Sequence, residues 1–157
     1  MTPAPAACVV ITVSSSRAAA GGGHDASGDL IAARLEQLPA RVIGRTLVAD
    51  DIEAIRAAVT AASADLVVLT GGTGVAPDDL TPEALRPLLD RELPGMAEAM
   101  RAAGLARTPH AMLSRQLAGV RGRTLILALP GSPRACEDCL DAIWAALPHA
   151  LDLLAAR

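Results

Sequence analysis

The sequence has almost no aromatic residues and no lysine. Of its 157 residues one is Trp, and Phe and Tyr are absent, so aromatic platforms for stacked bases are missing. The net charge of −3, without a basic cluster, also disfavours nucleic acid and anionic membrane surfaces as partners. Because there is no lysine, the chain cannot contain a Walker phosphate loop, which needs Gly-Lys-Ser/Thr. A hydrophobic content of 52% nevertheless predicts one globular domain over residues 1–157, with a core of Ala, Val, Leu and Ile.

Long apolar runs and paired cysteines are also lacking. No run approaches the roughly 18 residues that span a bilayer. Residues 1–5 lack the positive charge that precedes a signal-peptide core, and we therefore expect a cytoplasmic protein that does not bind membranes. Three cysteines, an odd number, fit a reducing compartment. Cys136 and Cys139 form a single C-x-x-C pair, and the histidines lack metal-ligand spacing, so we interpret both cysteines as ordinary helix residues.

Apolar, β-branched runs alternate with helical patterns along the chain. The runs predict strands at residues 7–13, 42–48, 66–70 and 123–129. Helices are predicted at residues 28–38, 52–63, 82–92, 96–103 and 133–147, with a short one from Pro148, while residues 119–122 are interpreted as a loop. Repeated strand–helix units predict an α/β fold with three layers, in which helices cover both faces of a mostly parallel sheet.

The stretch from residue 66 to residue 83 contains the strongest local signal. An apolar run is followed by Gly-Gly-Thr-Gly at 71–74, and glycines after a buried strand let the backbone turn sharply and bring its N–H groups close to a ligand. Two adjacent carboxylates follow at 78 and 79, and Thr81 as N-cap with Pro82 as first helical residue predicts a helix start. This combination favours a phosphorylated ligand with a divalent cation. For the loop alone, a plain tight turn is the alternative.

Three further polar loops follow predicted strands. They begin at Ser14, at Asp50 and at Pro130, and in the first of them Ser27 is the predicted cap of the next helix. The carboxyl ends of parallel strands meet at one edge of a sheet, so all these loops should line one crevice. Simpler interpretations remain open: a solvated turn at Ser14, compensation of a helix dipole by Asp50, and an exposed position for Arg115.

Several longer motifs occur in a fixed order. They are Thr-Gly-Gly-Thr-Gly at 70–74, Pro-Asp-Asp-Leu-Thr-Pro-Glu-Ala at 77–84, Glu-Leu-Pro-Gly-Met at 92–96, Ala-Met-Leu-Ser-Arg at 111–115, Ala-Gly-Val-Arg-Gly at 118–122 and Leu-Pro-Gly-Ser-Pro at 129–133, with weaker matches at 17–21 and 25–28. Together they resemble the Mog/MoaB family of molybdopterin adenylyltransferases, which act in molybdenum cofactor biosynthesis. The resemblance covers nearly the whole chain.

The resemblance implies a molybdopterin-binding-domain-like fold, a reaction and a set of site residues. The reaction is Mg²⁺-dependent transfer of AMP from ATP to the terminal phosphate of molybdopterin, with release of pyrophosphate. Asp50 and Asp79 are implied as the catalytic residues that also hold the metal. The residues expected around the nucleotide phosphates are Thr70, Gly71, Gly72, Thr73, Gly74, Ser14 and Ser15; those expected around molybdopterin are Asp25, Ser27, Gly28, Ser114, Arg115, Pro130, Gly131 and Ser132. The division of these residues between nucleotide and pterin stays open.

The resemblance also implies partners. We expect a homotrimer, or a hexamer made of two trimers, and the downstream molybdate-insertion protein is a further expected partner. Three positions depart from the family pattern: Ser16 and Ala128 replace a frequent Asp and Asn, and Asp78 replaces a frequent Arg. The departures at Asp78 and Ala128 motivate one alternative, a molybdopterin-binding carrier or assembly protein without catalysis. A nucleotide hydrolase on the same fold is the other, and adenylyl transfer is preferred because both acidic positions are retained.

Overall fold

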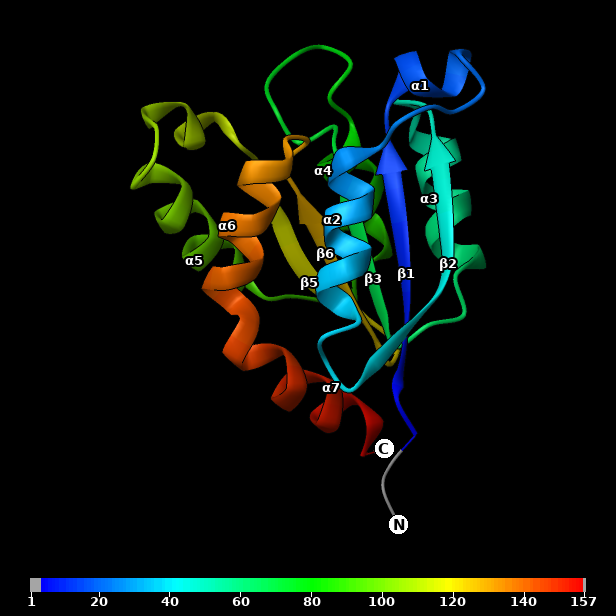
Figure 1. Cartoon of the computed structure of the whole chain (residues 1–157), viewed down its shortest axis with the longest axis vertical. Helices are drawn as coiled ribbons and strands as arrows, with labels where there is room; N and C mark the ends of the chain where they lie inside the picture. Colours follow the sequence, from blue (N-terminus) through cyan, green and yellow to red (C-terminus); the bar gives the residue numbers. More distant parts are fainter. Residues whose placement is uncertain (1–3, 157) are drawn as a thin grey trace.

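The protein is built on a sheet with strand order β2-β1-β3-β6-β5-β4, seen in the computed structural model, which describes residues 4–156 (Figure 1). The strands are β1 (Ala6–Val13), β2 (Ala40–Val48), β3 (Leu66–Thr70), β4 (Arg91–Glu92), β5 (Leu117–Arg121) and β6 (Thr124–Leu129). The first four strands in this order are parallel, whereas β5, near one edge, pairs antiparallel with both β6 and β4. The predicted mostly parallel sheet is therefore confirmed. Residues 1–3, part of the segment judged not to be a signal peptide, lie outside the described residues.

Helices cover both faces of this sheet. They are α1 (Ser15–Ala19), α2 (Ala26–Leu35), α3 (Ile52–Ala61), α4 (Thr81–Leu85), α5 (Pro94–Leu105), α6 (Pro133–Ile143) and α7 (Leu147–Ala155), with 3-10 turns η1 (Arg86–Leu88), η2 (Pro109–Leu113) and η3 (Trp144–Ala146). Figure 1 shows α2, α5 and α6 in front of the sheet and α3 and α4 behind it. The expected three layers are thus present.

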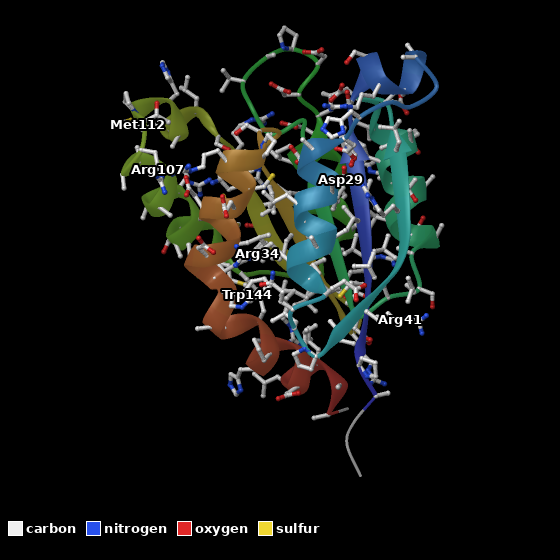
Figure 2. The ribbon with its side chains drawn as sticks, viewed as in Figure 1. Asp29, Arg34, Arg41, Arg107, Met112 and Trp144 are labelled. Atoms are coloured by element: carbon white, nitrogen blue, oxygen red, sulfur yellow. The ribbon has the colours of Figure 1, made fainter. Side chains whose placement is uncertain are left out.

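The central strand β3 shows why the sequence folds this way. All five of its residues are buried, because alternate side chains pack into different layers. Leu66 and Val68 join the core beneath α2, α5 and α6, while Val67 and Leu69 join the core beneath α3 and α4. Within the front layer, Arg34 ties α2 to α6: it pairs with Asp141 at 2.8 Å and lies 4.5 Å from the centroid of the Trp144 ring (Figure 2).

Two predicted elements near the antiparallel edge are wrong. The helix expected at 82–92 ends at Leu85, continues as η1, and gives way to β4, because Pro87 removes a backbone donor that a continued helix needs. The loop expected at 119–122 is strand β5 for most of its length, and only Gly122, with φ of 58°, makes the turn into β6. Glycine at 119 marks close packing, since a Cβ there would lie 2.7 Å from the Arg91 carbonyl oxygen.

Two predicted helix caps are also wrong, for a shared reason. Asp25, not Ser27, caps α2, and Leu80, not Thr81, occupies the N-cap position of α4. The hydroxyls of Ser27 and Thr81 are buried and donate to carbonyl oxygens of neighbouring loops, Ser27 to Gly131 at 2.6 Å and Thr81 to Gly71 at 2.8 Å. Both serve to join loops rather than to cap helices. Separately, no helix within residues 4–156 combines the length and hydrophobicity of a membrane span.

The packing at Gly119 generates a stability prediction. Gly119→Ala should lower the free energy of unfolding by about 1–3 kcal/mol, because the new methyl group meets backbone and Leu89 at once. Gly95→Ala is the matched control: it lies in the first turn of α5 with no heavy atom within 4 Å of the added Cβ, and it should be neutral or stabilising. Urea unfolding followed by circular dichroism measures both, and equal midpoints for the two variants would contradict the prediction.

Candidate active site

The loops after β1, β2, β3 and β6 gather at the carboxyl edge of the parallel strands, at the top of Figure 1. Direct contacts join them in pairs. Ser15 after β1 contacts Asp50 after β2, and Thr70 at the end of β3 donates its hydroxyl to the Pro130 carbonyl oxygen at 2.7 Å. The structure therefore confirms the convergence of these loops.

The glycine loop begins with two residues whose conformation excludes a side chain. Gly71 has a φ of +101°, and a Cβ there would lie 2.3 Å from the Val13 carbonyl oxygen. Gly72 has a φ of +67°, and its Cβ would lie 2.3 Å from Thr81 Oγ1 and 3.2 Å from Asp50 Oδ1. Both positions need glycine, for the left-handed backbone and for the close approach.

Some hydrogen-bond donors of the glycine loop are engaged within the protein, and others are free. Gly71 N–H donates to the Leu129 carbonyl oxygen at 3.1 Å, and the Thr70 hydroxyl is engaged by Pro130. In contrast, the N–H groups of Gly72, Thr73 and Gly74 donate to no acceptor within residues 4–156. Successive free N–H groups in a tight loop form a concave site for an anion. Of the residues predicted around the nucleotide phosphates at 70–74, only the last three therefore keep a backbone N–H group without an acceptor.

Asp50 is held by Ser15 through reciprocal hydrogen bonds. Ser15 donates its N–H and its hydroxyl to Asp50 Oδ2, at 3.0 and 2.8 Å, and its hydroxyl accepts from the Asp50 N–H at 2.9 Å. The neighbouring Asp51 caps α3 by accepting from the Ala54 N–H at 2.8 Å. Asp51, rather than Asp50, therefore caps the helix start. Asp50 Oδ1 instead faces the Gly72 backbone.

Asp79 approaches the same loop from its other end. Its Oδ2 accepts from the Ala76 N–H at 2.9 Å and lies 2.6 Å from where a Cβ of Gly74 would be. In the described part of the chain, Oδ1 of Asp79 and Oδ1 of Asp50 accept no hydrogen bond. Mg²⁺ is usually held by one or two carboxylates together with phosphate oxygens and water. Residues 4–156 hold no group of three metal-ligating side chains. Asp50 beside Gly72 and Asp79 beside Gly74 each leave one carboxylate oxygen free for a cation, whose shell phosphate oxygens and water would complete.

Arg115 reaches this loop from the segment before β5. Its backbone N–H donates to the Thr73 carbonyl oxygen at 2.6 Å, and its guanidinium donates to the carbonyl oxygens of Gly74 at 2.7 Å and Asp79 at 2.8 Å. The guanidinium also pairs with Glu83 on α4. Hydrogen bonding from Arg115 holds the pKa of Glu83 below its usual value, against the opposing effect of partial burial.

The start of α2 contributes the predicted residues Asp25, Ser27 and Gly28. Burial opposes ionisation of Asp25, but hydrogen bonds from the Thr12 hydroxyl at 2.5 Å and the Gly28 N–H at 3.0 Å, together with Arg45, hold its pKa below the usual value. A Cβ on Gly28 would lie 2.2 Å from the Asp25 carboxylate, so this cap needs glycine. All three residues have partners within the protein, and Ser27 joins the start of α2 to the loop at Gly131.

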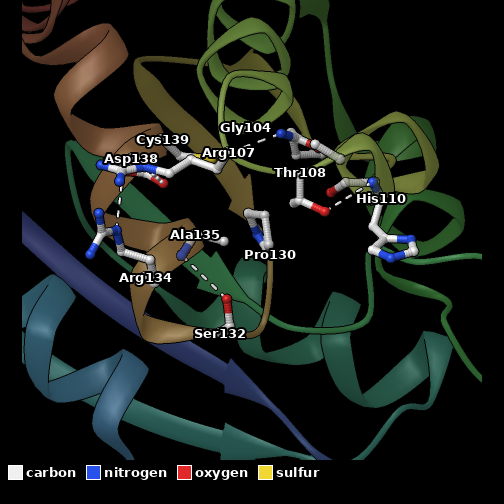
Figure 3. A pocket seen from close by; sticks show the side chains of 13 residues that line it. Gly104, Arg107, Thr108, His110, Pro130, Ser132, Arg134, Ala135, Asp138 and Cys139 are labelled. Atoms are coloured by element: carbon white, nitrogen blue, oxygen red, sulfur yellow. Dashed lines mark hydrogen bonds and ion pairs between the residues drawn. The ribbon is translucent and has the colours of Figure 1, made fainter.

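A pocket of about 270 Å³ lies next to these loops, between α6 and the α5–η2 segment (Figure 3). Three predicted molybdopterin residues, Ser114, Pro130 and Ser132, line it. The Ser114 hydroxyl and Gln116 Oε1 are buried there without a hydrogen-bond partner. A buried polar atom without a partner costs free energy, and neither atom is exposed to the pocket in this structure.

Several lining residues of this pocket were missed by the sequence analysis. They are Gly104, Arg107, Thr108, His110, Ala111, Gln116, Arg134, Ala135, Asp138 and Cys139. Asp138 on α6 pairs with Arg107 at 3.0 Å and with Arg134 at 3.6 Å, which joins α6 to the turn that follows α5. Residues 111–115 were noted as a motif, but no local pattern indicated that α6 would face them.

The C-x-x-C pair lies in α6, as interpreted from the sequence. Cys136 donates to the Pro130 carbonyl oxygen at 3.0 Å, and both thiols are almost fully buried. Burial raises the pKa of Cys136 to about 11 and that of Cys139 to about 12. Neither thiol therefore ionises near neutral pH, and the reactivity of a redox pair is not expected.

This burial predicts thiol reactivity. At pH 8 the native protein should react very slowly with a thiol-specific disulfide reagent, because Cys8, Cys136 and Cys139 are buried and protonated. In 6 M guanidinium chloride all three cysteines should be modified within minutes, which serves as the control. Rapid modification of a native thiol, measured by absorbance and mass spectrometry, would contradict the assignment of these residues to the core.

Comparisons with known proteins agree with this arrangement. A family described as "Probable molybdopterin binding domain" matches residues 9–149. The chain is 38% identical to molybdenum cofactor biosynthesis protein B of Escherichia coli, covering 90% of this chain and 84% of that one. A molybdopterin adenylyltransferase of Helicobacter pylori is 49% identical over 90 residues, which cover 57% of this chain and 51% of that protein.

The solved structures give the same result over more of the chain. The molybdopterin biosynthesis enzyme MoaB of Thermus thermophilus superposes with a TM-score of 0.88 at 44% identity, covering 97% of this chain and 98% of that one. The chain spans only part of other curated relatives, such as 22% of Dictyostelium discoideum gephyrin. The family match, the shared fold and the arrangement of loops show that this chain belongs to the molybdopterin-binding-domain family.

Proposed function

We propose that this chain is a Mg²⁺-dependent molybdopterin adenylyltransferase of molybdenum cofactor biosynthesis, which transfers AMP from ATP to molybdopterin and releases pyrophosphate. One observation carries the proposal. Two carboxylates, each with an oxygen free of hydrogen bonds, flank a loop with three free N–H groups, and a pocket with unpartnered polar atoms lies beside them. The adenylyltransferase name of the Helicobacter pylori relative supports the same reaction.

The reaction requires the protein to position two substrates more than to supply a nucleophile. An oxygen of the molybdopterin phosphate forms a bond to the α-phosphorus of ATP, and the bond between the α-phosphorus and the bridging oxygen breaks, which releases pyrophosphate. A phosphate monoester is largely ionised at neutral pH, so no side chain has to remove a proton from it. Bringing two anions together requires neutralised charge and alignment.

The residues of this chain divide those tasks. The N–H groups of Gly72, Thr73 and Gly74 would bind nucleotide phosphates, and Asp50 and Asp79 would hold Mg²⁺, which supplies positive charge at the phosphates. Ser15 orients Asp50 through its two donor groups. The pocket lined by Ser114, Pro130 and Ser132, three of the residues implied around molybdopterin, would take the pterin.

The departures from the family pattern do not favour the carrier alternative. Asp78 is exposed on the outer part of its loop, and it accepts no hydrogen bond in residues 4–156, unlike Asp79. Ala128 is fully buried in the core beneath α3 and α4, so this departure changes packing. Ser16 is exposed on α1. None of the three removes a residue to which the proposed reaction assigns a task.

Location and assembly complete the proposal. We place the enzyme in the cytoplasm, as a homotrimer or a hexamer made of two trimers, with molybdate insertion as the downstream step. Leu105, Met112 and Leu113 are 42%, 67% and 52% exposed on α5 and η2, and this apolar surface supports burial between subunits. Met112 points outward at the tip of this segment (Figure 2). Light scattering coupled to size exclusion measures the assembly.

Pyrophosphate release by the purified protein with ATP and Mg²⁺ tests the reaction. We expect release only when molybdopterin is added, with adenylylated molybdopterin detected by mass spectrometry. Release without molybdopterin would instead identify a nucleotide hydrolase. Tight binding of molybdopterin with no release under any condition would identify a carrier.

The two carboxylates generate a mutational prediction. Asp79→Asn should lower the rate of AMP transfer by about 10²–10³-fold, because a neutral amide holds Mg²⁺ poorly, and the melting temperature should change little. The adjacent Asp78→Asn is the matched control, since it removes the same charge from an exposed side chain. Equal rates for the two variants would remove Asp79 from the metal site.

The free N–H groups of the glycine loop generate a second mutational prediction. Gly72→Ala should weaken ATP binding by about tenfold or more, because its methyl group meets Thr81 and approaches the Asp50 carboxylate. Gly122→Ala is the control for backbone strain: its φ of +58° is also left-handed, but no atom lies within 4 Å of the added Cβ. Titration calorimetry with α,β-methylene-ATP and Mg²⁺ measures binding. A loss in both variants would point to general destabilisation instead.

A further inference from the structure

The short segment Ser114-Arg115-Gln116 lies between the two halves of the proposed site. Ser114 has extended backbone angles, φ of −79° and ψ of 124°, and in extended chain successive side chains point to opposite sides. Ser114 and Gln116 line the pocket on one side. Arg115 points to the other side, toward the glycine loop and Asp79. One segment therefore contacts both the pocket and the phosphate loop.

The contacts of Arg115 span the whole loop between β3 and α4. Its N–H and guanidinium donate to the carbonyl oxygens of Thr73, Gly74 and Asp79, at 2.6, 2.7 and 2.8 Å. Residues 75–78 between these points are exposed, and the loop's own hydrogen bonds there are local ones between Ala76 and Asp79. Arg115 is thus the tie that fixes this loop to the neighbouring segment.

Arg115 is itself held from two directions. Glu83 on α4 pairs with its guanidinium, and Arg101 on α5 donates to the flanking carbonyl oxygens of Ser114 and Gln116, at 3.1 and 3.2 Å. All three guanidinium nitrogens of Arg115 donate within the protein. A guanidinium engaged in this way orients other groups.

We propose that Arg115 is a positioning residue for the reaction: it fixes the 73–79 loop so that the Asp79 carboxylate and the free N–H groups meet the nucleotide phosphates and Mg²⁺. This inference rests on the proposed function, and it places Arg115 outside direct contact with either substrate. The sequence resemblance had implied a molybdopterin contact for Arg115. The geometry instead assigns the side chain to the loop, with Ser114 and Gln116 facing the pocket.

The test compares Arg115→Ala and Arg115→Lys with Arg56→Ala. Arg56 is a close match: its guanidinium also donates to two backbone carbonyl oxygens, those of Glu83 and Ala84, and pairs with one glutamate, Glu53. The side chains are similarly exposed, 31% for Arg56 and 33% for Arg115. Loss of either side chain should therefore change stability to a similar degree, but only Arg115 contacts the loop.

Hydrogen exchange of the unliganded protein gives the first readout. Arg115→Ala should raise the exchange rate of the hydrogen-bonded loop amides, those of Ala76, Asp79 and Thr81, by about tenfold, because the loop loses its tie. Arg56→Ala should leave the exchange of these amides unchanged. Lysine keeps the positive charge but cannot donate to three acceptors in one plane as a guanidinium does. The exchange rates in Arg115→Lys should therefore lie between those of the wild type and Arg115→Ala. Unchanged exchange in Arg115→Ala would overturn the proposal, whatever the activity of the protein.

The Mg²⁺ dependence of AMP transfer gives the second readout. Arg115→Ala should raise the Mg²⁺ concentration for half-maximal rate by about 10–100-fold, with much of kcat recovered at saturating Mg²⁺, because the carboxylate is misplaced and not removed. A raised KM for ATP or molybdopterin without a change in Mg²⁺ dependence would identify a direct substrate contact and overturn the proposal.

Two alternative experiments apply where the first ones cannot be carried out. If the protein transfers no AMP, Mn²⁺ binding with α,β-methylene-ATP replaces the rate, and the same 10–100-fold weakening in Arg115→Ala is expected. If Arg115→Ala does not fold, Arg115→Lys and Glu83→Gln take its place, and Glu83→Gln should raise loop exchange less than Arg115→Lys does, since the contacts to the carbonyl oxygens remain. Wild-type exchange and Mn²⁺ binding in both replacement variants would overturn the proposal.

Discussion

The close backbone approach at the end of β3 is the constraint on which the rest of the site depends. Gly71 passes over the Val13 carbonyl oxygen of β1 on one side and donates its N–H to Leu129 of β6 on the other. The central strand thereby locks its loop to both neighbouring strands. The Thr81 hydroxyl adds a bond to the Gly71 carbonyl oxygen, which closes the loop onto the start of α4. Because these groups are engaged, the next three N–H groups are left for a ligand.

The parallel part of the fold could be predicted from the sequence, and the antiparallel edge could not. β1, β3 and β6 are continuous apolar runs because helices cover both of their faces, and such runs are visible locally. β4 has only two residues, both exposed, and the short apolar run of β5 is interrupted by Gly119, which locally indicates a turn. Their pairing depends on the contact of Gly119 with Leu89 and Arg91, which only the folded chain brings together.

The site shows the same limit at the level of single side chains. Acids and glycines could be placed by their order after strands, because parallel strands bring such loops to one edge. The pocket could not be predicted from the sequence, because Asp138 and Arg134 come from a helix that meets the α5–η2 segment only in the folded chain. The hydroxyls of Ser27 and Thr81 were misassigned for a related reason: a local cap was expected where a partner in another loop was available.

Charge pairing around the site bears on the proposed role of a cation from solution. The chain has no lysine, and several arginines near the crevice already face carboxylates: Arg115 with Glu83, Arg45 with Asp25 and Asp29, and Arg107 and Arg134 with Asp138. These guanidinium groups stabilise the loops but leave little unpaired positive charge for phosphates. The free N–H groups contribute only partial charges. Asp50 and Asp79 add negative charge beside the glycine loop, and the proposed divalent cation would neutralise both them and the substrate phosphates. The arrangement thus separates the arginines that hold the site in shape from the cation that would act on the substrate.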